Sequence, residues 1–316
     1  MSELHPKMQA ILDAMEEAGM PDWQEDDWAE AQAYLDAREG AYYSPPVEVG
    51  AIAECTIPGP AGPIPVRVYT PLGVAADPPL PVLIYYHGGG WVFGSLESHD
   101  PECRALANAA GAVVMSVDYR LAPKHKFPAA AEDCCAAVTW AAASAAEIGG
   151  DPARIAVAGD SAGGNLAAVA AQFAVRQGAP RLALQLLIYP VVAAATDTES
   201  YNRYAEGYVL TREAMQYFID SYLNDPSEAG DPRVSPLLAE DVSGAAPALV
   251  VSASHDPLVD EGKAYADKLA AAGVPVEYAC YDGMTHGFQL WGTWLEASGD
   301  LHERCGAALK RAFGAA

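Results

Sequence analysis

The chain carries at residues 159–163 the sequence Gly159-Asp160-Ser161-Ala162-Gly163, set between two contrasting segments. The apolar run 154–158 before it is typical of a buried strand, and the alanine-rich run 165–171 after it is typical of a helix. A sharp turn from strand to helix leaves no room for side chains beside its central residue, which explains the two flanking glycines. The pattern predicts that Ser161 stands at a strand end as a nucleophile, with a functionless turn as the alternative.

Short apolar runs alternate with helix-length segments over most of the chain. Runs that indicate buried strands lie at 81–86, 112–117, 154–158, 182–189, 247–252 and 274–280, after two β-like runs at 47–57 and 64–70. Alanine-rich segments that indicate helices lie at about 99–110, 128–147, 161–177 and 259–272, and a closing helix is expected at 295–313. This alternation predicts an α/β fold with a mostly parallel central sheet flanked by helices.

Two segments fall outside the alternation. Residues 1–45 carry two helical patterns, and their apolar faces are Met8, Ile11, Leu12 and Met15 in the first and Trp28, Ala31, Tyr34 and Leu35 in the second. Residues 193–245 hold one helix candidate, 212–223, and no clear strand. A long excursion of this kind inside a compact α/β domain is usually a lid or a binding insertion.

The composition limits the classes of partner and cofactor. Of the 316 residues 51% are hydrophobic, enough for a sizeable core in one large domain or two ordinary ones. The 18 Lys and Arg against 42 Asp and Glu make an acidic surface, which would repel phosphate backbones, so no nucleic-acid partner is expected. The six cysteines show no Cys-x-x-Cys spacing, so we expect reduced, mostly buried thiols, no metal site and no cofactor.

The chain shows no targeting or membrane signal. Its first seven residues lack a basic start followed by an apolar stretch and a small-residue cleavage site. No run approaches the roughly 18 apolar residues that indicate a membrane span. We therefore expect a soluble, cytoplasmic protein without a membrane span.

A serine hydroxyl is a poor nucleophile at neutral pH, and it needs donors for the oxyanion as well as a base. The sequence His87-Gly88-Gly89-Gly90 follows the strand candidate 81–86, where glycines let backbone N–H groups point at a developing charge. We predict Gly88, Gly89 and the amide of Ala162 as the oxyanion donors. A flexible loop and a phosphate cradle are the alternatives, although no Lys-Ser/Thr follows as a P-loop requires.

The orienting acid and the base follow downstream in the chain. Asp256 comes just after the strand candidate 247–252, at the strand end where α/β sites assemble. His286 follows the strand candidate 274–280, and the order serine, acid, histidine is that of the α/β-hydrolase triad. The acids weighed against Asp256 are Asp260, Glu261 and Asp282, and the histidines weighed against His286 are His5, His87, His99, His125, His255 and His302. We predict Ser161, Asp256 and His286 as the catalytic residues.

Taken together, these motifs resemble those of the bacterial hormone-sensitive-lipase-like esterases, family IV of the lipolytic enzymes. The resemblance runs from about residue 65 to the C-terminus and rests on motifs that occur in the family's order: His87-Gly88-Gly89-Gly90-Trp91, Asp118-Tyr119-Arg120-Leu121-Ala122-Pro123, Gly159-Asp160-Ser161-Ala162-Gly163-Gly164, Asp256-Pro257-Leu258-Val259-Asp260 and Gly283-Met284-Thr285-His286-Gly287. Their joint occurrence is far more specific than the pentapeptide at 159–163 alone.

The resemblance implies an α/β-hydrolase core of about eight strands under a helical cap. The core would comprise 46–192 and 246–316, and the cap would comprise the helices of 1–45 and the insertion 193–245. It implies hydrolysis of carboxylic esters, usually with short to medium acyl chains, through a serine acyl-enzyme. It also implies supporting residues around the site, namely Asp118, Arg120, Glu132, Asp133 and Asp160.

The substrate and the assembly are less constrained by the sequence. The substrate is expected to be a small-molecule ester, with Trp91 and Tyr208 as candidate binding residues. The aromatic residues of the expected cap either line a short apolar pocket or attach cap to core; they are Trp23, Trp28, Tyr42, Tyr43, Tyr208 and Tyr217. A homodimer is possible for this family. A peptidase or amidase would use the same triad, and a non-catalytic receptor could share the fold, although receptor-like relatives typically lack the histidine that is present here as His286.

Overall fold

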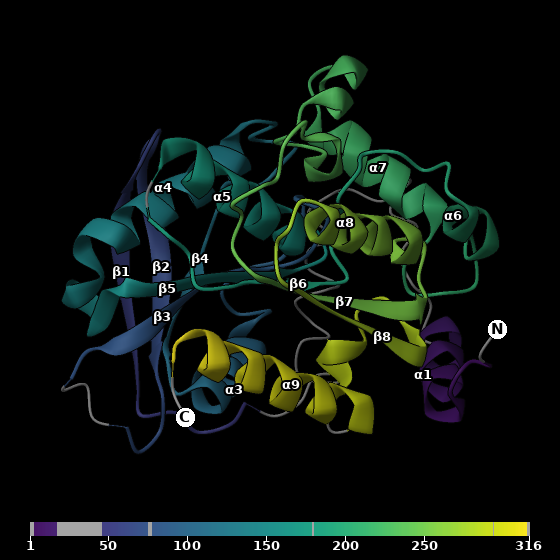
Figure 1. Cartoon of the computed structure of the whole chain (residues 1–316). Coiled ribbons are helices and arrows are strands. Elements are labelled where there is room, and N and C mark those ends of the chain that lie inside the picture. The colour runs from purple at the N-terminus through teal and green to yellow at the C-terminus, as the bar shows by residue number, and fades with distance from the viewer. Residues whose placement is uncertain (1–2, 18–45, 75–77, 179, 293, 315–316) are drawn as a thin grey trace.

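The computed structural model describes residues 3–17, 46–74, 78–178, 180–292 and 294–314. Its strands form one sheet in the order β1-β2-β4-β3-β5-β6-β7-β8 (Figure 1). The strand bounds are β1 Ala51–Gly59, β2 Gly62–Thr70, β3 Leu80–Tyr86, β4 Val113–Val117, β5 Gly150–Asp160, β6 Gln185–Ile188, β7 Ala248–His255 and β8 Val276–Thr285. The pairs β1–β2 and β2–β4 are antiparallel and all the others are parallel, which confirms the predicted mostly parallel sheet.

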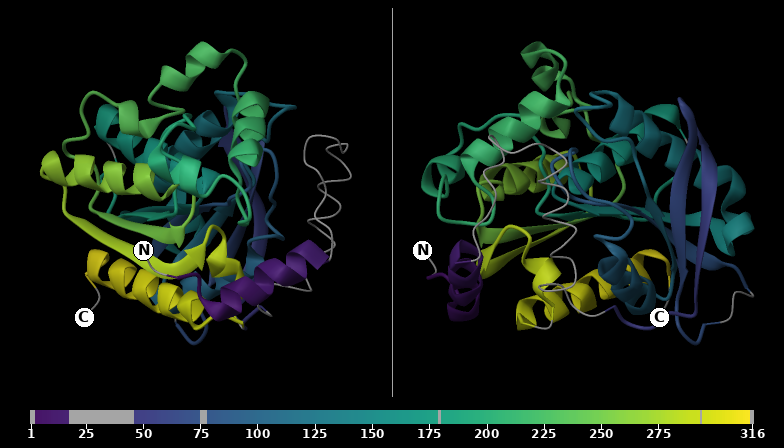
Figure 2. Two further views of the ribbon diagram at one scale, coloured as in Figure 1. Left: turned by 90° about the vertical axis from the view of Figure 1, so that its right-hand side faces the viewer. Right: turned by 180° about the vertical axis from the view of Figure 1, so that it is seen from behind.

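Helices cover both faces of the sheet because its central strands are apolar on both sides. In β3, Ile84 and Tyr86 point to one layer of buried side chains, and Leu83 and Tyr85 point to the other. The first layer is completed by α4 Ala129–Ser144, α5 Ala162–Gln177 and α8 Val259–Ala271, and the second by α3 Asp100–Ala110 and α9 Glu296–Ala312. Figure 2 shows these two helical layers on opposite sides of the sheet.

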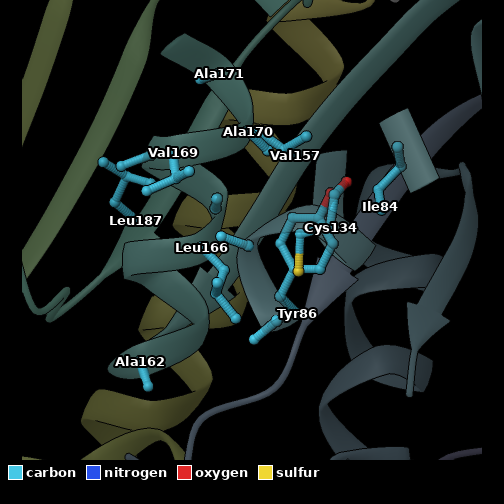
Figure 3. Packing of buried hydrophobic residues seen from close by; sticks show 14 of the residues in the cluster. Ile84, Tyr86, Cys134, Val157, Ala162, Leu166, Val169, Ala170, Ala171 and Leu187 are labelled. Atoms are coloured by element: carbon cyan, nitrogen blue, oxygen red, sulfur yellow. The ribbon is translucent and has the colours of Figure 1, made fainter. Parts of the chain in front are cut away.

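Helix α5 lies at the centre of the first layer, where it packs over three adjacent strands. Figure 3 shows its side chains, among them Leu166 and Val169, above Tyr86 of β3, Val157 of β5 and Leu187 of β6. The many alanines of this helix let its backbone approach the sheet closely. This packing holds the N-terminal end of α5, and with it residue 161, at a fixed place over the end of β5.

The first two strands form a ribbon whose end contains prolines. The sequence placed a break at 58–63, but β1 continues to Gly59 and β2 begins at Gly62, with Pro58 opposite Pro63. A proline within a strand removes one ladder hydrogen bond, and it is tolerated where the strand lies at the edge of a sheet. Strand β1 is such an edge strand, and β2 pairs with β4 only at residues 66–69. Pro58 and Pro63 therefore both lie where a missing N–H is tolerated, and the two strands extend further than their composition indicated.

The excursion 193–245 contains helices and, in the part that the structure describes, no strand. Its elements are α6 Glu199–Arg203, α7 Arg212–Tyr222 and the short helices η2 Pro226–Gly230 and η3 Pro236–Leu238. Figure 1 shows α7 on the side of α8 away from the sheet and α6 beyond one end of α8. The expected helix 212–223 is therefore present, and the division of the chain into core and cap stays a prediction.

The N-terminal segment is described only in part. Helix α1, Pro6–Glu17, buries Met8 and Ile11 in the same layer as α3 and α9, and the His5 amide donates to Gly283 O at 3.0 Å. Figure 2 shows α1 on the α9 side of the sheet, opposite α7. The second expected helix of 1–45, with Trp28 and Tyr34, lies outside the described residues. None of the described helices is long and apolar enough to cross a membrane.

We expect two glycines of helix α9 to respond in opposite ways to alanine. A Cβ on Gly306 would lie 2.6 Å from Ala109 Cβ in α3, whereas a Cβ on Gly299 meets nothing within 4 Å. Gly299→Ala should therefore raise the free energy of unfolding by about 1 kcal/mol through helix propensity. Gly306→Ala should lower it by about 1–3 kcal/mol because the helices are forced apart. Urea unfolding measures both, and stabilisation by Gly306→Ala would contradict the close α3–α9 packing.

Candidate active site

The pentapeptide 159–163 forms the turn from β5 into α5, as predicted from its neighbours. A Cβ on Gly159 would lie 2.3 Å from Gly163 O, and a Cβ on Gly163 would lie 2.0 Å from Tyr86 O. Neither position has room for a side chain. Ser161 has φ 54° and ψ −120°, in a region that residues with a Cβ rarely adopt, so the turn holds a strained serine.

Ser161, His286 and Asp256 come together from three segments of the chain. His286 Nε2 lies 2.9 Å from Ser161 Oγ, and His286 Nδ1 lies 2.7 Å from Asp256 Oδ2. The other carboxylate oxygen, Asp256 Oδ1, accepts from the Leu258 amide at 2.9 Å, which fixes the plane of the acid. All three side chains are largely buried.

The chemistry of the partners indicates the direction of the hydrogen bonds. An ionised carboxylate only accepts, so the imidazole of His286 donates from Nδ1 to Asp256. In the neutral ring Nε2 is then an acceptor, and it faces the hydroxyl of Ser161. The arrangement can remove the hydroxyl proton as Ser161 attacks an electrophile.

Two of the three acids that were weighed against Asp256, Asp260 and Glu261, have other contacts. Asp260 Oδ2 accepts from the Ser200 amide at 2.8 Å, at the start of α6. Glu261 Oε1 accepts from the amides of Val192 and Ala193 at 2.7 and 3.2 Å. Both acids lie in the first turn of α8, where Glu261 holds the chain at the start of the excursion and Asp260 holds the start of α6. Burial raises the pKa of Glu261 well above its usual range, against the two amide hydrogen bonds.

The other histidines with a described environment have partners other than Ser161 and Asp256. His302 pairs with Glu102 at 2.6 Å between α9 and α3, and the His255 ring packs against Tyr204 and Tyr208. His87 stacks on Tyr119, and burial, followed by the nearby His99, lowers the pKa of His87 to about 4. His87 is therefore a neutral support of the glycine loop at physiological pH.

The glycine loop 87–90 lies beside the turn, but one predicted donor has a different partner. The Gly88 amide donates to Asp160 Oδ1 at 3.0 Å, so Gly88 was the wrong choice as an oxyanion donor. A Cβ on Gly88 would lie 2.3 Å from Asp160 Oδ2, which explains the glycine there by packing. Within the described residues, the amides of Gly89, Gly90 and Ala162 donate to no acceptor.

Asp160 is a buried carboxylate that joins the turn to the glycine loop. Besides the Gly88 amide, Asp160 Oδ1 accepts from the Tyr85 hydroxyl at 2.7 Å, and His99 Nε2 lies 3.2 Å away. Burial opposes the charge of Asp160, but His99 and the Tyr85 hydroxyl outweigh it and lower the pKa of this carboxyl. Tyr85 was not identified as a site residue from the sequence, because its pattern indicates only a strand.

Further from the turn, Arg120 Nε donates to the buried Asp133 at 2.8 Å, consistent with a support of the fold.

The two candidate substrate-binding residues have different environments. Trp91 is fully buried and its ring stacks on Tyr222, with the ring centroids 4.5 Å apart. Trp91 therefore packs the loop against α7 and does not line a pocket, so this prediction was wrong. Tyr208 is partly exposed and packs against Tyr204 and His255, and its contact with a substrate stays a prediction.

The described residues contain no group of three or more His, Cys, Asp or Glu placed to hold a metal ion. All six cysteines are free, and three of them, Cys103, Cys134 and Cys305, are buried.

The strain at Ser161 has a measurable consequence. Ser161→Gly relieves the positive φ and Ser161→Ala does not, while both remove the hydroxyl, so we expect the glycine variant to be more stable by about 1 kcal/mol. At Ser298, inside helix α9, the order should reverse because glycine is the poorer helix former. Urea unfolding of the four variants tests this, and an alanine variant at 161 as stable as the glycine variant would show that the turn is unstrained.

Comparisons with known proteins agree with this geometry. Residues 83–290 match a family described as having the alpha/beta hydrolase fold. The carboxylic ester hydrolase LipN of Mycobacterium tuberculosis is 43% identical over 297 residues, which cover 91% of this chain and 78% of that protein. The ethyl acetate hydrolase of Pseudomonas putida is 45% identical over 74% of this chain and 74% of its own.

A solved structure resembles the whole described fold. It is that of LAE6, an alpha/beta hydrolase enzyme from the metagenome of Lake Arreo in Spain, with a TM-score of 0.94 and 41% identity. The match covers 98% of this chain and 99% of that one. These findings confirm the predicted fold and the predicted class of enzyme, a serine carboxylic ester hydrolase. The chain belongs to the α/β-hydrolase family, and its motifs are those of the hormone-sensitive-lipase-like esterases.

Proposed function

We propose that the chain hydrolyses small-molecule esters of short to medium acyl chains by two acyl transfers at Ser161. The observation that carries this proposal is the single hydrogen-bonded line from Ser161 Oγ through His286 to Asp256, with contacts of 2.9 and 2.7 Å. In this arrangement Ser161 Oγ can attack the carbonyl carbon of an ester placed beside it, which begins acyl transfer.

In the first transfer Ser161 Oγ bonds to the carbonyl carbon while His286 Nε2 takes the hydroxyl proton. The carbonyl oxygen becomes an oxyanion, for which we assign the amides of Gly89, Gly90 and Ala162 as donors. Collapse of this intermediate breaks the bond to the alcohol oxygen, and His286 gives its proton to the departing alcohol. Asp256 stabilises the charged imidazole during this step.

In the second transfer a water molecule attacks the acyl-enzyme. His286 takes a proton from the water, the same amides hold the second oxyanion, and collapse returns the proton to Ser161 and releases the acid.

The alternatives raised by the sequence, an amidase and an inert receptor, have no observation in their favour. A homodimer and a cytoplasmic location stay predictions of the sequence.

The role of Ser161 is tested by its alanine variant. Ser161→Ala should lower kcat for a short nitrophenyl ester by on the order of 10⁶-fold, because the nucleophile is gone, while the protein stays folded. A fluorophosphonate probe should label the unmodified protein and leave the variant unlabelled. Hydrolysis or labelling that persists in the variant would contradict the assignment. Faster turnover of a matched anilide than of the ester would favour an amidase.

The acyl-chain preference is tested with acetate, butyrate, octanoate and palmitate esters. Each buried methylene contributes about 0.8 kcal/mol until the pocket is filled, so kcat/KM should rise and then fall before palmitate. Tyr208 either lines the substrate pocket or attaches the cap to the core, and Tyr208→Ala distinguishes the two. The variant should shift the maximum of kcat/KM to longer acyl chains only if Tyr208 bounds the pocket. Highest activity on palmitate in the unmodified protein would contradict the proposed chain length.

A further inference from the structure

Helix α7 of the excursion contacts Gly90 of the glycine loop and Trp91, the residue that follows the loop. Tyr222 stacks its ring on Trp91, with an angle of 6° between the ring planes. One turn earlier in α7, Phe218 lies against Gly90, where a Cβ would come within 2.3 Å of the ring. Gly90 thus has the Phe218 ring in the place where any other residue would carry its side chain.

The rings of α7 are held in place from the core side. The Phe127 amide donates to Tyr222 O at 2.8 Å, and Lys126 Nζ donates to Leu223 O at 2.7 Å. The Phe218 ring also meets Phe93 edge-on at 6.0 Å between centroids. The position of α7 relative to the loop is therefore fixed by hydrogen bonds from Lys126 and Phe127 to backbone carbonyls at its C-terminal end and by aromatic packing along its side.

The loop needs support because its backbone is strained. Three successive residues have positive φ: Gly89 at 116°, Gly90 at 61° and Trp91 at 62°. A tryptophan in this region costs about 1–3 kcal/mol, which the surrounding contacts must offset. On one side Asp160 holds the Gly88 amide, and on the other side α7 packs against Gly90 and Trp91.

We propose that Phe218 is a positioning residue for ester hydrolysis, which keeps the amides of Gly89 and Gly90 aimed at the oxyanion. This inference rests on the proposed function. Without the ring, Gly90 has open space beside its Cα and no side chain of its own to limit its φ and ψ. The loop would then sample orientations in which the two amides miss the oxyanion, although substrate binding and Ser161 are unaffected. The excursion would in this way contribute to the chemical step and not only to the choice of substrate.

The test is the kinetics of Phe218→Ala on a short nitrophenyl ester. Loss of one oxyanion donor costs about 10²–10³-fold in kcat, so partial misplacement of two donors should cost about 10-fold or more, with KM within about twofold. Gln216→Ala is the matched control on the same helix, because Gln216 is exposed and, among the described residues, its side chain bonds only to Asp220. This variant should leave kcat unchanged.

A sulfur-substituted substrate separates an oxyanion effect from a general one. In a thionoester the charge develops on sulfur, a weak hydrogen-bond acceptor, so the oxyanion donors contribute less to its hydrolysis. Phe218→Ala should therefore slow the ordinary ester more than the thionoester, and the ratio of the two kcat values should fall by at least severalfold. Phe218→Leu, which refills part of the space, should restore part of the kcat and of this ratio.

Three results would overturn the proposal while Ser161→Ala remains inactive. The first is an unchanged kcat in Phe218→Ala. The second is a lower kcat with an unchanged ratio of ester to thionoester. The third is a change confined to KM and chain-length preference, which would make Phe218 a pocket wall. If Phe218→Ala does not fold, the same criteria apply to Phe218→Leu. Activity in Ser161→Ala would instead refute the proposed function itself.

Discussion

The close approach between the first turn of α5 and the end of β3 determines the arrangement of the site. A Cβ on Gly163 would lie 2.0 Å from Tyr86 O and 2.5 Å from His87 O, so the two backbones are in direct contact. Ser161 lies at the start of α5, and the glycine loop begins where β3 ends. Their separation is therefore set first by backbone contact, and the Asp160 side chain secures it by accepting a hydrogen bond from the Gly88 amide. A nucleophile and its oxyanion donors need this fixed separation, because the donors must already be in place when charge develops.

Backbone strain is concentrated around the same point. Among the described residues, those other than glycine with positive φ are Trp91, Ser161 and Tyr189. Trp91 follows the glycine loop, Ser161 is the proposed nucleophile, and the Tyr189 ring lies 4.5 Å from the ring of His286. Strained residues persist only where surrounding packing holds them. Here β3, α5 and α7 hold Trp91 and Ser161, and the rings of His286 and Phe288 pack against Tyr189. Packing in the folded protein thus keeps Trp91, Ser161 and Tyr189 in backbone conformations that an isolated chain would rarely adopt.

The sequence predicted the sheet and the line from Ser161 through His286 to Asp256 because both follow from local patterns. Strand ends of a parallel sheet lie at one edge, so the serine, acid and histidine that follow three strands meet there. The choice of Gly88 over Gly90 failed because it depends on which amide Asp160 binds, and a run of three glycines carries no signal of that contact. The prediction that Trp91 binds substrate was wrong because the sequence pattern is the same whether an aromatic residue near the site faces a substrate or packs on Tyr222. The contribution of Phe218 could not be predicted, since it lies far from the loop in the chain and only the docking of α7 brings it there.

The account rests on the claim that the amides of Gly89, Gly90 and Ala162 converge on one point beside Ser161 Oγ. A crystal structure of the protein after reaction with a short alkyl phosphonate tests this directly, because the phosphonyl oxygen mimics the oxyanion. We predict a covalent bond from phosphorus to Ser161 Oγ and a phosphonyl oxygen about 2.7–3.1 Å from each of the three amide nitrogens. A phosphonyl oxygen that faces away from the glycine loop, or one bound to the Gly88 amide in place of Asp160, would contradict it.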